Sequence, residues 1–247
     1  MGDDERGPAL RPVVTVFGVT GGVGTTAAAA LLAQAMASRG SSVTAVDLNP
    51  HAPYLAETLG LGAPADGLEA YLRDRERAAL PFDNASLYVV PGLSDLGNLD
   101  DLSVESALTL LDRLRPAALV IDVAPVVVDP AVYASLRFAT DLVLVAEPRP
   151  ACLKAARRLR ALFERLGLPW GEVTLLVTNT RPGPGTDGSW PRIDWFGEIG
   201  LSPACELPYG DLCDRATRYS ALARLWPLAS RFLREAPGCV AGQEPRS

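Results

Sequence analysis

A glycine-rich segment with the sequence TGGVGTTA, residues 20–27, joins an apolar run at 13–17 to an alanine-rich stretch that begins at Thr26. Glycines let a backbone curl so that several N–H groups point at one phosphate, and the start of a helix adds a favourable electrostatic potential. This spacing therefore predicts a phosphate-binding loop that opens a helix. The residues predicted to contact a bound nucleotide here are Gly21, Gly22, Val23, Gly24, Thr25, Thr26 and Ala27.

The elements that must position this loop alternate along the chain. Short apolar runs, which are typical of strands buried on both faces, occur at 13–17, 43–46, 87–90, 118–121, 142–145 and 173–177. Helical patterns at 26–39, 104–114 and 151–166 separate some of them. This order predicts an α/β fold, a doubly wound and mainly parallel sheet with helices on both faces. Ligands bind such sheets beyond the carboxyl ends of the strands.

Two loop classes compete for residues 20–27. The phosphate loop GxxxxGK[ST] fits Gly24 and Thr26, but Thr25 stands at its lysine position. The dinucleotide-binding pattern GxGxxA is matched literally, and Asp47 follows at about the distance of a ribose-binding acid. By spacing alone the dinucleotide pattern is the better formal match.

Other segments resolve this competition by resemblance. The loop resembles the deviant Walker A motif of the ParA/MinD family, KGGxGK[ST]T, with Thr20 and Thr25 in place of both lysines. The segments VTAVDLNP, LVIDVAPVVVDP, LLVTNTRP and ELPYGDLCDRA resemble, in family order, switch I, Walker B with switch II, the adenine-reading strand and the loop over the base. The resemblance spans residues 12–233. An oxidoreductase would also need an acid/base set such as Tyr-x-x-x-Lys, and Tyr133 is followed by Arg137 instead.

The resemblance implies that the hydrolytic machinery is degenerate. Thr25 stands for the lysine that neutralises the β- and γ-phosphates, and Thr20 for the lysine that reaches across a dimer. Asn49 stands for the carboxylate that orients water, so no catalytic residue is intact. Lys154 is the only lysine of the chain, yet neither lysine position holds arginine. Loss of a catalytic cation typically costs about 10³–10⁵ in rate, so a pseudo-ATPase is expected.

The same resemblance implies that the groups that bind ATP and Mg²⁺ are retained. Thr26, Asp47 and Asp122 would supply oxygen ligands to Mg²⁺, while Asn179 and Pro208 would contact adenine. Alternatives stay open for some of these residues. Either aspartate could instead cap a helix, and Asn179 could be a turn residue.

Within the family, GGVGTT is similar to the loop of the TadZ/CpaE branch, which localises the machinery of Tad-type (Flp) pili at the cell pole. This implies a homodimer across the nucleotide, and a pilus or secretion ATPase or a polar factor as partner. The alternatives are an active MinD- or ParA-type ATPase in partitioning or septum-site placement, an NAD(P)-binding Rossmann oxidoreductase, and a scaffold with an empty loop.

Composition bounds these functions. The 247 residues suit one domain at 12–236, with polar tails at 1–11 and 237–247. Scattered cysteines and a lone histidine argue against a Cys/His metal site and favour a reducing, cytoplasmic location, with peripheral contact at the inner membrane or cell pole as an option. The net charge of −6 does not attract nucleic acid.

Two basic segments could suggest DNA or membrane binding. For Lys154, Arg157, Arg158, Arg160 and Arg165 we favour a solvated helix face over nonspecific DNA binding. For the amphipathic stretch 215–234 we favour core packing over a membrane-surface helix, with Pro227 interrupting the pattern.

Overall fold

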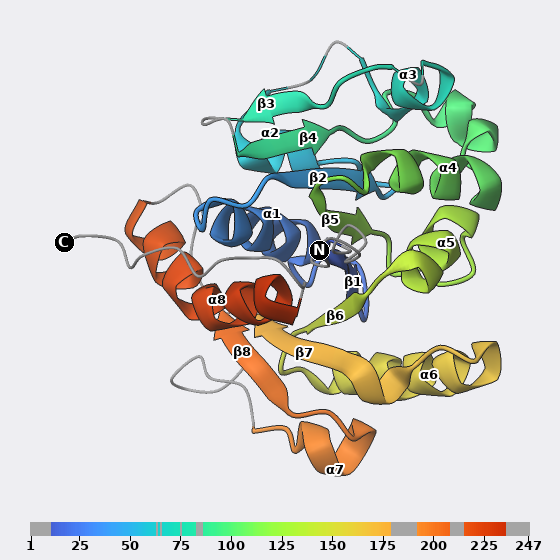
Figure 1. Cartoon of the computed structure of the whole chain (residues 1–247). Helices are drawn as coiled ribbons and strands as arrows, with labels where there is room; N and C mark the ends of the chain where they lie inside the picture. Colours follow the sequence, from blue (N-terminus) through green and yellow to red (C-terminus); the bar gives the residue numbers. More distant parts are fainter. Residues whose placement is uncertain are drawn as a thin grey trace, which may run out of the picture.

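The computed structural model describes residues 11–62, 64, 66–74, 76–82, 86–178, 192–207 and 215–235. Its centre is one eight-stranded sheet with the order β3-β4-β2-β5-β1-β6-β7-β8 (Figure 1). The strands are β1 (Val13–Gly18), β2 (Val43–Leu48), β3 (Leu80–Phe82), β4 (Leu87–Val90), β5 (Ala118–Val123), β6 (Asp141–Ala146), β7 (Val173–Thr178) and β8 (Pro203–Leu207). Both predicted tails fall outside the described residues, apart from Arg11.

Helices cover both faces of the sheet (Figure 1). The α-helices are α1 (Thr25–Ala37), α2 (Leu55–Leu59), α3 (Leu68–Arg73), α4 (Val104–Leu114), α5 (Pro130–Phe138), α6 (Pro150–Leu166), α7 (Trp195–Ile199) and α8 (Arg215–Glu235). Two 3₁₀ turns, η1 (Leu96–Asp101) and η2 (Trp170–Glu172), lie between them. Helices α1 and α8 pack side by side on one face, and α4, α5 and α6 lie on the other.

The predicted strands form because their apolar residues can be buried on both sides. Every residue of β1, β2, β5 and β7 is buried, as two layers of helices require. All strand pairs are parallel except β3 with β4. The fold prediction is therefore confirmed, although the apolar pattern did not predict the two edge strands, the short antiparallel β3 and the parallel β8.

The strand order separates the two loop classes that the sequence left in competition. In the dinucleotide fold, β1 pairs with β2. Here β5 lies between β1 and β2 and pairs with both. This inserted strand brings Asp122 beside the end of β1 and beside Asp47 at once. This strand order is not that of a Rossmann dehydrogenase. The strand order therefore contradicts the interpretation of the chain as an NAD(P)-binding Rossmann oxidoreductase.

Helix α8 is a core helix. Six of its apolar residues are buried and two more, Leu222 and Trp226, are half-buried; the buried ones are Ala221, Leu225, Leu228, Ala229, Phe232 and Leu233. The predicted interruption at Pro227 is wrong, because the helix continues through Pro227 to Glu235. Among the described residues, none of the helices has the length and apolar character needed to cross a membrane.

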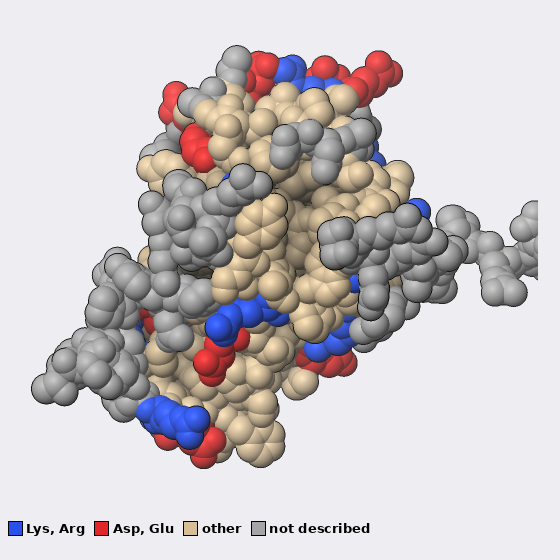
Figure 2. All heavy atoms as spheres, turned by 90° about the vertical axis from the view of Figure 1, so that its left-hand side faces the viewer, with Lys and Arg blue, Asp and Glu red and all other residues tan. Residues whose placement is uncertain are grey.

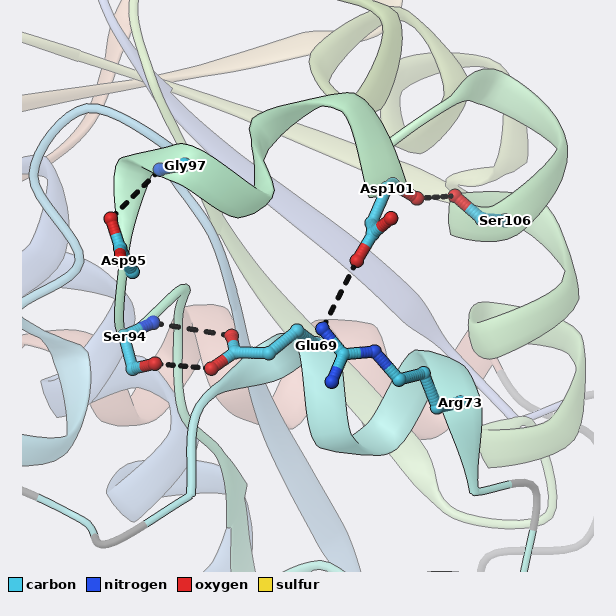
Figure 3. Close-up of polar contacts among 7 residues, drawn as sticks. All are labelled: Glu69, Arg73, Ser94, Asp95, Gly97, Asp101 and Ser106. Carbon is cyan, nitrogen blue, oxygen red and sulfur yellow. Dashed lines mark hydrogen bonds and ion pairs between the residues drawn. The ribbon is translucent and has the colours of Figure 1, made fainter.

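Polar contacts hold the chain that follows β4 against α3 (Figure 3). The Glu69 carboxylate accepts hydrogen bonds from the Ser94 backbone N–H, at 3.2 Å, and from the Ser94 hydroxyl. Arg73 pairs with Asp101 of η1 at 3.3 Å. The Leu68 N–H, at the start of α3, donates to the Gly92 carbonyl at 2.9 Å. These contacts fix the carboxyl end of β4, which borders the candidate site.

Candidate nucleotide-binding site

The loop between β1 and α1 has the backbone shape of an anion-binding turn. Gly22 and Gly24 adopt left-handed conformations, with φ of 78° and 86°, which side chains with a Cβ rarely adopt. Gly24 is the N-cap of α1, and neither a side-chain cap nor an acidic residue occupies the first turn. The N–H groups of that turn are therefore free of side-chain caps and directed out of the helix end, where they can hold a phosphate.

Thr25, at the position of the Walker lysine, lies against the base of this loop. A Cβ on Gly18 would come within 2.4 Å of the Thr25 hydroxyl oxygen, so Gly18 must lack a side chain. Thr20, at the position of the other lysine, has its hydroxyl oxygen 4.0 Å from the Cys152 sulfur on α6. Neither threonine brings a charge to the loop.

Asp47 and Asp122 occupy paired positions on β2 and β5. Neither side chain is exposed to solvent. Neighbouring parallel strands lie about 4.8 Å apart, so two carboxylates at paired positions interact strongly. The two acids that the sequence singled out are therefore brought together at the strand ends next to the loop.

Asp122 lacks the hydrogen bonds that a buried carboxylate normally requires. Neither of its oxygens has a hydrogen-bond partner among the described residues. Burial raises the pKa of Asp122 well above its usual value, and the charge of Asp47 raises it further, while the nearby Thr26 hydroxyl lowers it. An unsatisfied buried carboxylate is expensive unless a ligand or a proton satisfies it.

Asp47 has a structural role as well. One of its oxygens accepts from the Asn49 N–H and the other from the Leu55 N–H at the start of α2, both at 3.0 Å. Burial raises its pKa to about 7, against the lowering effect of these hydrogen bonds. Asp47 therefore does bond the start of a helix, which was the alternative to metal binding. Each of its oxygens keeps a further lone pair that a cation could use.

The segment 49–52 is folded by Asn49. Its side-chain oxygen accepts from the N–H groups of His51 and Ala52, both at 3.2 Å. This is a local turn in which the residue at the position of the water-orienting acid bonds its own backbone. The exposed His51 ring lies 3.7 Å from the Asp129 carboxylate, which caps α5. An ion pair can thus join the switch I and switch II segments.

Gly92 and Thr178 also shape the site, although the sequence pattern did not single them out. A Cβ on Gly92 would meet Pro53 at 2.2 Å and the Asp47 carboxyl carbon at 3.0 Å. The Thr178 hydroxyl, at the end of β7, donates to the Val23 carbonyl of the loop at 2.6 Å. Asn179 and Pro208, predicted to contact adenine, lie outside the described residues.

The chemistry of these donors fits Mg²⁺. No cluster of three or more His, Cys, Asp and Glu side chains occurs among the described residues. Mg²⁺ does not need one, because it commonly binds one or two carboxylates and completes its shell with water and phosphate oxygens. The unpartnered oxygens of Asp122, the adjacent Asp47 and the Thr26 hydroxyl form such a set.

Basic side chains are dispersed on the face drawn in Figure 2. There the described Lys and Arg side chains form several small groups, some of them beside acidic side chains, and no single large basic patch is visible among the described residues. The five basic residues of α6 are all exposed, which agrees with a solvated helix face. Two of them are paired: Arg157 with Glu198, and Arg160 with Glu164 at 3.0 Å.

A glycine loop that opens a helix, with buried aspartates on two strands beside it, is typical of nucleotide-binding α/β domains. Residues 14–182 match the family model of the CobQ/CobB/MinD/ParA nucleotide binding domain. The match covers more than half of the chain, and the chain belongs to this family. A search of the curated proteins found no significant match.

Solved structures share the fold. A ParA family ATPase from Chlorobium tepidum TLS gives a TM-score of 0.73 at 17% identity, over 92% of this chain and 96% of that chain. The MinC:MinD cell division protein complex of Aquifex aeolicus gives 0.71 at 18%, over 93% and 99%. The septum site-determining protein MinD of Pyrococcus horikoshii OT3, complexed with Mg-ADP, gives 0.67 at 19%, over 92% and 94%. At these identities the likeness shows the fold alone, and it confirms the predicted architecture.

Proposed function

We propose that this chain binds Mg·ATP with little or no hydrolysis and acts as a localisation or assembly factor of a cellular machine. The observation that carries this proposal is a contrast between the groups of the site that would bind a nucleotide and the positions that would hydrolyse it. The left-handed glycines of the loop and the paired, buried Asp47 and Asp122 support binding of a nucleotide and a cation. Both lysine positions hold threonine, and Asn49 is engaged in a local turn.

Several family properties extend the proposal. The family's Mg-ADP complex supports Mg²⁺ and adenine nucleotide as ligands, and Asn179 and Pro208 remain the proposed adenine contacts. The similarity of GGVGTT to the TadZ/CpaE loop supports a role at a Tad-type pilus, with a secretion ATPase or a polar factor as partner. We also propose a cytoplasmic location, with peripheral contact at the inner membrane or the cell pole as an option.

A homodimer across the nucleotide fits the exposed side chains of the two switch segments. Val128 is 73% exposed, Tyr54 62% and Val126 40%. Apolar groups that flank a binding loop are well suited to be covered by a second copy of the chain. The MinC:MinD complex shows that a protein of this fold assembles with another protein.

An active ATPase is the second candidate. The ParA family ATPase of Chlorobium tepidum shares the fold over almost the whole chain, and Asp122 remains unpartnered in the site. An active ATPase would require another group to supply the positive charge that the two lysines of the family motif would bring to the phosphates.

One set of measurements tests both candidates. Thermal unfolding and phosphate release are followed for the full chain with Mg²⁺ and ATP, ADP or NAD, beside an Asp122→Ala variant. A ligand at a hundred times its Kd stabilises by about 2.7 kcal/mol. We expect ATP and ADP to raise the Tm, NAD to leave it unchanged, and phosphate release to stay at background. Robust release that disappears in Asp122→Ala would establish the ATPase instead.

A further inference from the structure

A buried ion pair lies at the carboxyl end of β6. Glu147 is only 1% exposed, and its carboxylate pairs with the guanidinium of Arg149, whose side chain is 25% exposed. The Arg149 N–H also donates to the Glu147 carbonyl at 2.7 Å. Apart from this ion pair, the two carboxylate oxygens of Glu147 have no hydrogen-bond partner among the described residues. The buried Nε of Arg149 has none there either. The pair is thus incompletely satisfied.

The turn that carries this pair lies directly against the glycine loop. Before the pair, the Val145 carbonyl accepts from the Val19 N–H at 3.0 Å. The Thr178 hydroxyl lies 3.4 Å from the Ala146 carbonyl while it bonds the loop at Val23. After the pair, Cys152 contacts Thr20. Contacts on both sides of residues 147–149 therefore hold this turn beside the loop.

A carboxylate buried next to a phosphate loop is unfavourable on two grounds. It loses its hydration, and it repels the phosphate that the loop would bind. Arg149 offsets both effects as long as it stays beside Glu147. A purely structural pair would be expected to satisfy its remaining polar atoms, since half-satisfied buried charges are costly. Because the Glu147 oxygens and the Arg149 Nε have no other hydrogen-bond partner among the described residues, only the ion pair has to break for the guanidinium to change partner.

We propose that Arg149 supplies the phosphate-directed positive charge that Thr20 and Thr25 lack, and that Glu147 holds its guanidinium while no nucleotide is bound. In the free protein the guanidinium rests on Glu147, and with nucleotide bound it turns to the terminal phosphates. Guanidinium groups suit this task because they bind phosphate oxygens through two parallel hydrogen bonds. This inference rests on the proposed function and names the residue that makes it workable without lysine.

The test compares Kd values of the full chain for Mg·ATP and for AMP by calorimetry. Arg149→Gln should weaken ATP binding about 10- to 100-fold, the range for one charged contact, and leave AMP nearly unchanged. Glu147→Gln should tighten ATP binding, because it removes the competing carboxylate. Arg158→Gln is the matched control, since Arg158 is exposed on α6, the helix that begins directly after Arg149. A pair that only stabilises the fold would produce neither the ATP-over-AMP selectivity nor the tightening.

Removing Arg149 alone leaves a buried charge and could unfold the chain. The double variant Glu147→Gln/Arg149→Gln has no such charge and should fold while it still binds ATP weakly. The variant to compare with Arg158→Gln is Arg149→Gln, or the double variant if Arg149→Gln does not fold. If that variant binds ATP as tightly as Arg158→Gln does, this inference is overturned and the proposed function stands. Absence of ATP binding by the unmodified chain overturns both.

Discussion

Asp47 and Asp122 lie side by side as paired residues of adjacent parallel strands, and both are shielded from water. One is bonded to two backbone N–H groups, and the other has no hydrogen-bond partner among the described residues. This asymmetry assigns the two acids different tasks. Asp47 supports the chain around it, and the oxygens of Asp122 would be available to a cation under the proposed function.

The raised pKa values predict how the ligand-free protein responds to pH. The pKa of Asp47 is about 7 in the folded state against 3.8 as its ordinary value, mainly through burial, and that of Asp122 is raised in the same direction. The folded state therefore binds protons more tightly than the unfolded state. The free energy of unfolding should fall as the pH rises from about 4 to about 7.

Asp122→Asn removes one of the two charges and should raise stability at pH 7.5 by on the order of 2 kcal/mol, with a flatter pH dependence. Urea unfolding between pH 5.5 and 8 measures this. Asp112→Asn, a change at an exposed position, is the control and should have little effect. An equal pH slope in the unmodified chain and in Asp122→Asn would contradict the prediction.

Removal of Mg²⁺ should weaken the effect of ATP on stability. A divalent cation between the phosphates and Asp122 neutralises the carboxylates that repel each other. The rise in Tm with ATP should therefore be larger with Mg²⁺ than with EDTA. In Asp122→Ala the difference should disappear, and its persistence there would place the metal elsewhere.

Thr25→Lys should increase the affinity for ATP about tenfold or more, because it returns a cation to the loop. Turnover should stay near background, since Asn49 still lacks the carboxylate that orients water. Calorimetry and phosphate release on the same sample check both points. Thr58→Lys adds the same charge at an exposed position of α2, and equal tightening there would show a general charge effect instead.

Gly92→Ala tests the packing around Asp47. The added Cβ would overlap Pro53 at 2.2 Å, so we expect a loss of about 1–3 kcal/mol in stability and weaker Mg·ATP binding. Gly171→Ala has no heavy atom within 4 Å of its new Cβ and should change neither. Thermal unfolding and calorimetry on the pair of variants separate local overlap from a general effect of alanine.

Much of the fold could be predicted because buried parallel strands have a clear pattern. All six predicted runs lie within strands of the structure. The edge strand β3 has only three residues, none of them buried, and includes Pro81. In the other edge strand, β8, only two of five residues are buried. Neither forms an apolar run long enough to be predicted as a buried strand. The continuation of α8 through Pro227 was also missed, since buried neighbours on both sides of Pro227 hold the helix together.

The candidate site was predictable where residue type alone limits the chemistry. The glycines, Thr26 and the two aspartates meet at one edge of the sheet as expected. The insertion of β5 between β1 and β2 was not predictable, because apolar strands of similar composition can pair in several orders. The burial of Glu147 and the close approach of Gly92 to Asp47 depend on neighbours that are distant in sequence.

The hydrogen bonds that the Asp47 carboxylate accepts from the N–H groups of Asn49 and Leu55 have one more consequence. Any cation that draws on this carboxylate acts at the same time on the chain from 49 to 55, including exposed Tyr54. Occupancy of the site would thereby change the conformation of an exposed segment, where a partner could recognise it. If the chain does not cleave its nucleotide, as proposed, each bound period would end only by dissociation, and the fraction of molecules with an occupied site would follow the ATP concentration of the surroundings.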